Sequence, residues 1–132
     1  MKFFIAAVFL ILVFVMPVST KVKNTAKVQK QTITGYLVDM NCASMIVKGA
    51  KDKIEKKAKR HTRECNLDEM CAAAGYTVIS NGTVVRLNDA GNTMALAYCK
   101  SIAKKDNIRV DVVGVLSGDI LAVESIHDAA AE

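Results

Sequence analysis

The 132-residue sequence has no tryptophan and a single proline, Pro17, and its four phenylalanines all lie within the first 18 residues. Beyond residue 20 the aromatic side chains are Tyr36, Tyr76 and Tyr98, which fall in different segments. Sites for single-stranded nucleic acid stack bases on aromatic side chains, so we do not expect a nucleic-acid partner. No second long apolar run follows the first, which excludes a multi-pass membrane protein.

Several motifs of known chemistry are also missing. The sequence contains no C-x-x-C dithiol, no C-x-x-C-H haem attachment, no H-x-E with P-C-x-x-C and no glycine-rich phosphate loop. Asp39 and Glu64 could flank a cleft, but most aspartates in such positions serve as caps or in turns, and they do not form a recognised acid/base pair. We therefore do not predict an enzyme.

The chain begins with the pattern of a secretory signal peptide. Lys2 precedes 16 apolar residues, Phe3 to Val18, which Ser19 and Thr20 follow. This run is shorter than the roughly 20 residues that span a bilayer. We predict a signal peptide over residues 1–20 and export to the periplasm or the medium, with no stable membrane span after its removal. An uncleaved anchor is the alternative.

The rest of the chain is one small domain. The roughly 112 residues after the signal leave no room for a second core. Residues 21–31 hold four lysines and no acid, and we expect a flexible basic lead-in there. The domain is predicted over residues 32–128.

Alternating apolar residues predict five strands. The first covers Thr32–Asp39, where Gly35 indicates a bulge or a close backbone contact. Asn81-Gly82 predicts a type I′ hairpin that pairs Ile79 with Val84 and Val78 with Val85. This register places Tyr76, Val78, Val85 and Leu87 on the core face. The last two strands form a hairpin within residues 108–126, about Ser117-Gly118-Asp119.

Two helices complete the prediction. A helical insert over residues 46–63 follows the first strand, with Ile46, Ala50, Ile54 and Ala58 as its apolar stripe. A second helix is expected over Thr93–Lys105, with Asn92 as its N-cap and Cys99 on its inner face. The fold class is thus mainly β with two helices, a small five-stranded OB-like barrel with a helical insert after strand 1.

Positive charge is concentrated in the insert. Residues 48–63 carry eight basic side chains against Asp52 and Glu55, and the barrel outside the insert and the lead-in is net acidic. Such charges can simply form the solvent-exposed side of a helix. The functional alternative is contact with an anionic envelope surface. The predicted basic surface comprises Lys53, Lys56, Lys57, Lys59, Arg60 and Arg63.

Sulfur-containing side chains gather between the first strand and the first hairpin. Cys42, Cys65 and Cys71 lie there with His61, Met40, Met45 and Met70. An even number of cysteines in a short exported chain indicates disulfides. We predict a bridge within the set Cys42, Cys65, Cys71 and Cys99, with the pairing open and Cys99 either a core residue or the fourth partner.

These residues allow three hypotheses. The first is an exported, disulfide-stabilised, non-enzymatic binding module with an unspecified ligand and no cofactor. The second is a soft-metal protein that binds Cu or Zn, since thiolate, thioether and imidazole ligands suit those ions. Its ligands would come from Cys42, His61, Cys65, Cys71, Met40 and Met70. The third is a thiol-redox protein, which would need a cysteine of depressed pKa.

Four segments resemble a group of small exported bacterial proteins of unknown function. They are GYLVDMNCASM (residues 35–45), HTREC (61–65), MCAAAGY (70–76) and VVGVLSGDILAVESI (112–126). The resemblance implies that Cys42, His61, Cys65 and Cys71 are signature positions of the group, and that Cys99 is not. It implies no activity.

Overall fold

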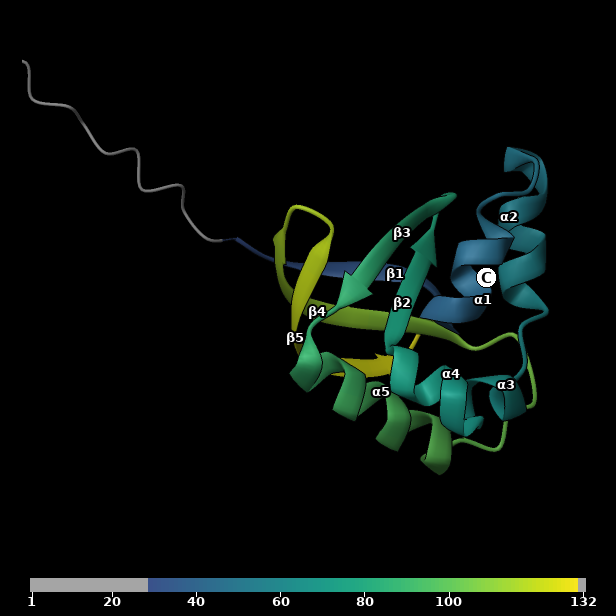
Figure 1. Cartoon of the computed structure of the whole chain (residues 1–132). Helices are drawn as coiled ribbons and strands as arrows, with labels where there is room; N and C mark the ends of the chain where they lie inside the picture. Colours follow the sequence, from purple (N-terminus) through teal and green to yellow (C-terminus); the bar gives the residue numbers. More distant parts are fainter. Residues whose placement is uncertain (1–28, 131–132) are drawn as a thin grey trace, which may run out of the picture.

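The computed structural model describes residues 29–130 and shows five strands in one closed sheet (Figure 1). The predicted signal peptide and most of the predicted lead-in lie outside the described residues. The strands are β1 (Lys30–Asp39), β2 (Tyr76–Ser80), β3 (Thr83–Leu87), β4 (Arg109–Ser117) and β5 (Ile120–Asp128). Their order around the sheet is β1-β2-β3-β5-β4, and β1 pairs with both β2 and β4.

The two predicted hairpins are present. Ile79 pairs with Val84 and Val78 with Val85, as the turn at Asn81-Gly82 required. Both turn residues have positive φ, 50° at Asn81 and 75° at Gly82, which is the type I′ geometry that matches the twist of the flanking strands. The β4–β5 hairpin closes at Gly118, and the short β3–β5 pairing is the parallel contact that completes the closure.

Apolar side chains from all five strands fill the inside of the barrel. The predicted core face is confirmed, since Tyr76, Val78, Val85 and Leu87 are all buried. Gly35 of β1 makes the close contact that its position predicted. A Cβ there would lie 2.4 Å from the carbonyl oxygen of Ile79, a distance at which only glycine fits.

The predicted single insert helix is wrong, because the segment between β1 and β2 folds into four short helices. These are α1 (Met40–Ile46), α2 (Lys51–Lys59), α3 (Arg63–Leu67) and α4 (Glu69–Ala74). Side chains of Asp39, Thr62 and Asp68 cap α1, α3 and α4, and each such cap starts a new helix. Ala50 is exposed at the start of α2 and does not continue the stripe. With α5, the described chain has five helices where two were expected.

Helices α1 and α2 cover the outer face of β1. Ala43, Ile46, Ile54 and Ala58 are buried, and they form a second apolar cluster with Tyr36, Val38 and Ile79. The end of β1 is therefore buried on both faces. This packing places the start of α1 and the end of α2 beside the carboxyl end of β1 (Figure 1).

The fifth helix, α5 (Asp89–Ser101), begins and ends four residues earlier than predicted. Asn88 is its N-cap and accepts from the N–H of Gly91 at 3.0 Å. Asn92, the predicted cap, instead accepts from the backbone N–H of Tyr76 at 2.8 Å. Asn88 and Asn92 are equally good N-cap residues by their local sequence. The hydrogen bond between Asn92 and β2 leaves Asn88 as the cap. Cys99 is buried on the inner face of α5, as expected. None of the described helices has the length and apolar character needed to cross a bilayer.

Candidate functional site

Four side chains converge where β1 ends and α1 begins. Asp39, Cys42, His61 and Cys65 each offer a ligand atom, and these four atoms all lie within 4.8 Å of one another. Asp39 is completely buried, His61 is 9% exposed, and the two cysteines are half-buried. Of the residues that the sequence grouped, the structure brings Cys42, His61 and Cys65 together, and Asp39, which the predicted ligand set did not include, is the fourth member.

Helix caps position the cysteines. Oδ1 of Asp39 accepts from the N–H of Cys42 at 2.9 Å, and Oγ1 of Thr62 accepts from the N–H of Cys65 at 3.2 Å. Each cysteine thus lies three residues after the cap of a short helix, where its backbone is fixed. The two sulfur atoms are 3.5 Å apart. The D-x-x-C and T-x-x-C spacings are sequence signals that could have identified these caps.

Asn66 connects α3 to the end of β1. Its Oδ1 accepts from the N–H of Asp39 at 2.9 Å, and its Nδ2 donates to the carbonyl of Leu37 at 3.1 Å. The hydroxyl of Tyr76 donates to the carbonyl of Asn66 at 2.6 Å. Burial raises the pKa of Tyr76 to about 12, so this hydroxyl stays a donor. Sequence reasoning missed Asn66, because nothing in its local pattern indicates burial.

The Asp39–His61 pair has unused polar atoms. Nε2 of His61 lies 3.0 Å from Oδ2 of Asp39, yet neither atom makes a well-aligned hydrogen bond. In the described part of the chain, the buried side-chain atoms without a hydrogen-bond partner are Oδ2 of Asp39 and both ring nitrogens of His61. Buried polar atoms in this state are costly, and among the described residues they occur together at this one pair.

The local charges favour protonated thiols when no cation is present. Burial opposes ionisation of Asp39, but the His61 side chain and the N–H of Cys42 outweigh it and hold the pKa of Asp39 at about 2. Burial, the Cys65 thiol and the Asp39 carboxylate raise the pKa of Cys42. Burial and the same carboxylate raise the pKa of Cys71 to about 11. A bound cation would reverse this effect, because metals bind the thiolate form.

The other candidate residues named from the sequence lie apart from this group of four. Cys71 is half-buried and faces the Asp39 carboxylate without joining the group. Cys99 is buried in the barrel core. Met70 is 76% exposed, Met40 lines a different cavity, and Glu64 is exposed. All four cysteines are free thiols, and the 3.5 Å between Cys42 and Cys65 exceeds the S–S bond length of about 2.05 Å.

The predicted basic surface is present with one exception. Arg63 is half-buried, and its Nε donates to the carbonyl of Cys99 at 2.9 Å, so it ties α3 to α5. The other predicted members are exposed along α2 and at its C-cap: Lys53, Lys56, Lys57, Lys59 and Arg60.

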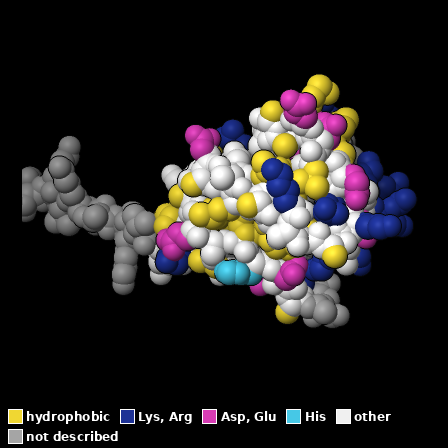
Figure 2. Space-filling view, turned by 90° about the horizontal axis from the view of Figure 1, so that it is seen from below, with side chains coloured by type: hydrophobic (Ala, Val, Ile, Leu, Met, Phe, Trp, Pro, Cys, Tyr) yellow, Lys and Arg dark blue, Asp and Glu magenta, His cyan; other side chains and the backbone are white. Residues whose placement is uncertain are grey.

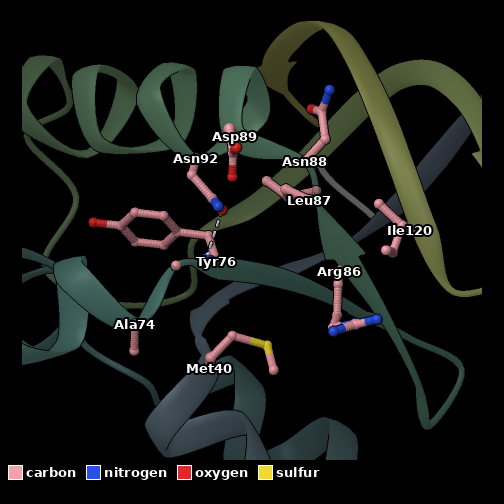
Figure 3. Close-up of a pocket in the computed structure, with 10 residues that line it drawn as sticks. Met40, Ala74, Tyr76, Arg86, Leu87, Asn88, Asp89, Asn92 and Ile120 are labelled. Atoms are coloured by element: carbon pink, nitrogen blue, oxygen red, sulfur yellow. Dashed lines mark hydrogen bonds between the residues drawn. The ribbon is translucent and has the colours of Figure 1, made fainter.

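A separate cavity of about 380 Å³ lies between β3 and the start of α5 (Figure 3). Two of its polar side chains have partners within the fold. Asn92 accepts from Tyr76, the dashed contact in Figure 3, and the guanidinium of Arg86 is paired with Asp119 at 2.8 Å. Met40, Leu87 and Ile120 supply apolar walls. This cavity has none of the unpartnered buried atoms that distinguish the Asp39–His61 group.

Comparison of the chain with protein-family models, with curated proteins and with solved structures found no match in any of the three.

Proposed function

We propose that this protein is an exported, OB-like zinc-binding module in which Asp39, Cys42, His61 and Cys65 bind one Zn²⁺ ion. The observation that carries the proposal is the set of buried atoms on Asp39 and His61 that lack a hydrogen-bond partner beside two thiols. A cation would give Oδ2 of Asp39 and one nitrogen of His61 a partner. It would also stabilise the two thiolates, since it removes the protons that burial now retains.

The distances suit a tetrahedral ion. Typical Zn–S and Zn–N/O bond lengths imply ligand-to-ligand distances of about 3.3 to 3.8 Å in a tetrahedron. The two sulfur atoms are 3.5 Å apart, the Asp39–His61 contact is 3.0 Å, and no pair exceeds 4.8 Å. Small side-chain rotations would bring all four atoms to bonding distance.

The ligand types favour zinc over copper. Cu(I) prefers soft sulfur ligands and also accepts imidazole, whereas zinc accepts carboxylate oxygen as well. Here one of the four ligand atoms is a carboxylate oxygen, and the thioethers that would attract Cu(I) lie outside the group. Copper is therefore the second metal to test.

The architecture and the compartment form part of the proposal. The strand order β1-β2-β3-β5-β4, with α5 between β3 and β4, supports an OB-like barrel. The pattern of residues 1–20 supports export. Outside the cytoplasm a module of this size gains stability from a metal or a disulfide.

A disulfide between Cys42 and Cys65 is the second candidate, favoured by the 3.5 Å between their sulfur atoms. It would remove two of the four proposed zinc ligands, so the bridge and the ion exclude each other. The raised pKa values of Cys42 and Cys71 speak against a thiol-redox enzyme that relies on either as its nucleophile.

Intact-mass spectrometry of the protein purified from its own compartment separates these candidates. Native spectra of the reduced protein are expected to show one zinc, lost on denaturation, after mixing with equal amounts of Zn²⁺ and Cu(I). Cys65→Ser should lose the ion, because it removes a ligand. Cys71→Ser is the matched control, a neighbouring half-buried cysteine outside the group, and should keep it.

Two results would overturn the zinc proposal. The first is a reduced wild-type protein that binds no zinc, or binds Cu(I) in its place. The second is Cys65→Ser protein that is folded by circular dichroism and binds zinc as tightly as wild type. A denatured, unreduced mass lower by two hydrogens, and restored in Cys42→Ser, would establish the disulfide instead.

A further inference from the structure

Within residues 29–130, none of the cations of α2 forms an ion pair. Among the described residues, ion pairs involve Lys30, His61, Arg86 and Lys104, none of which belongs to α2. The carboxylate of Glu55 in α2 contacts the β2–β3 turn, where its Oε1 accepts from the N–H of Gly82 at 3.0 Å. The exposed cations of α2 and its C-cap that form no ion pair within the described residues are Lys51, Lys53, Lys56, Lys57, Lys59 and Arg60.

This arrangement does not stabilise the fold. Lys53 and Lys57, like Lys56 and Arg60, are four residues apart, a spacing at which like charges repel on a helix. Favourable interaction with the helix dipole needs one or two cations in the last turn, not six along the helix and its cap. The Lys and Arg side chains gather at the right of Figure 2, the side on which α2 lies in Figure 1. The surplus charge points to an anionic partner.

A groove next to these cations adds an apolar component. It is lined by Cys42, Met45, Ile46, Lys57, Arg60 and His61. Met45 of α1 is 62% exposed, so an uncovered apolar side chain lines the same groove as the cations of Lys57 and Arg60. The same groove thus combines positive charge with an exposed apolar wall.

We infer that α2 and this groove form a docking surface for an anionic phospholipid membrane. Cations near such a surface are attracted by its negative potential, and an exposed apolar residue beside them can enter the interface. An acidic polysaccharide would match the charge but not Met45. Nucleic acid would need aromatic side chains, which the described parts of α1 and α2 do not have. This inference goes beyond zinc binding and does not depend on it.

Co-sedimentation with phosphatidylglycerol–phosphatidylcholine vesicles tests the inference on the full chain. We expect binding that increases with the phosphatidylglycerol fraction and weakens with salt. Lys57→Gln/Arg60→Gln should bind the vesicles about thirtyfold more weakly. Each cation near an anionic surface contributes about 1 kcal/mol to binding, and this variant removes two of them. Met45→Gln should lose about threefold, and that loss should persist in high salt because it is apolar.

The matched control is Lys100→Gln/Lys105→Gln, which removes the same charge from exposed positions on and after α5. It should bind like wild type, and any contribution of residues 1–28 is common to all variants. Equal weakening in both double variants would overturn the inference, as would unchanged binding in Lys57→Gln/Arg60→Gln. So would binding to dextran sulfate or single-stranded DNA that is tighter than binding to vesicles and indifferent to Met45.

Discussion

The side-chain Oδ1 of Asn66 accepts a hydrogen bond from the backbone N–H of Asp39 at 2.9 Å, across 27 residues of sequence. The same amide donates to the carbonyl of Leu37 at 3.1 Å, and Asn66 is completely buried. Asn66 therefore continues the hydrogen bonding of β1 on the edge where its pairing with β4 ends, at Tyr36, while β2 pairs with the opposite edge. Through this contact α3, which carries Cys65, is held against the residue that caps α1.

Asn66→Ala should destabilise the protein strongly. The substitution leaves the N–H of Asp39 and the carbonyl of Leu37 without these side-chain partners in a buried place, which costs about 2 to 4 kcal/mol. Urea unfolding measures the loss. Asn41→Ala is the control, because the amide of Asn41 is exposed and makes one long contact of 3.4 Å. It should change stability by less than about 0.5 kcal/mol. Similar effects of the two variants would contradict the bridging role of Asn66.

The lowered pKa of Asp39 predicts that the free energy of unfolding decreases in acid. That pKa is about 2 in the folded protein against an ordinary value of 3.8. A lowered pKa means that the carboxylate stabilises the fold above pH 3.8, and that this contribution disappears as the pH falls toward 2. Its size is about 2 kcal/mol.

Urea unfolding of the zinc-free protein at pH 5, 3.5 and 2.5 tests this, with Asp39→Asn for comparison. Asparagine keeps the helix cap but cannot ionise, so the stability difference from wild type should shrink as the pH falls. Asp119→Asn is the control, because the pKa of Asp119 is also lowered, by Arg86, but that carboxylate is exposed. A difference between wild type and Asp39→Asn that stays constant with pH would refute the prediction.

Cys71 should react slowly in the reduced, zinc-free protein. Its pKa of about 11, against 9.0 for the ordinary thiol, reduces the thiolate fraction at pH 8. The higher basicity returns part of the lost nucleophilicity, so the net slowing is about tenfold. Iodoacetamide labelling followed by peptide mass spectrometry gives the rate, with the protein unfolded in urea as the reference. A Cys71 that reacts as fast in the folded as in the unfolded protein would show that neither burial nor the Asp39 carboxylate raises its pKa.

Gly35→Ala should cost several kcal/mol. The added methyl would lie 2.4 Å from the carbonyl oxygen of Ile79 and 2.7 Å from Cγ1 of Val78, so β1 and β2 would have to separate. Gly118→Ala serves for comparison, since its position has a φ of 62° but open space around it. That variant should lose about 1 kcal/mol from backbone strain. Thermal unfolding ranks the two, and a smaller effect at Gly35 would show that the strands can move apart.

Local patterns determined much of the barrel. Alternating apolar residues and the Asn81-Gly82 turn were enough to predict the β2–β3 register and its buried face, because neighbouring strands joined by a tight turn leave little freedom. The grouping of Cys42, His61 and Cys65 after the first strand was likewise evident from spacing. The helices between β1 and β2 were harder, since single cap residues decide where such short segments start.

The tertiary structure alone decided which residues complete the site. Asp39 meets His61, and Asn66 reaches back to β1, through contacts between segments more than 20 residues apart. Such contacts leave no periodic trace in the sequence. The burial of His61 and the burial of Cys99 in the barrel core depend in the same way on how α1, α3 and α5 pack. Packing energy, summed over many weak contacts, selected these partners among residues that were locally equivalent.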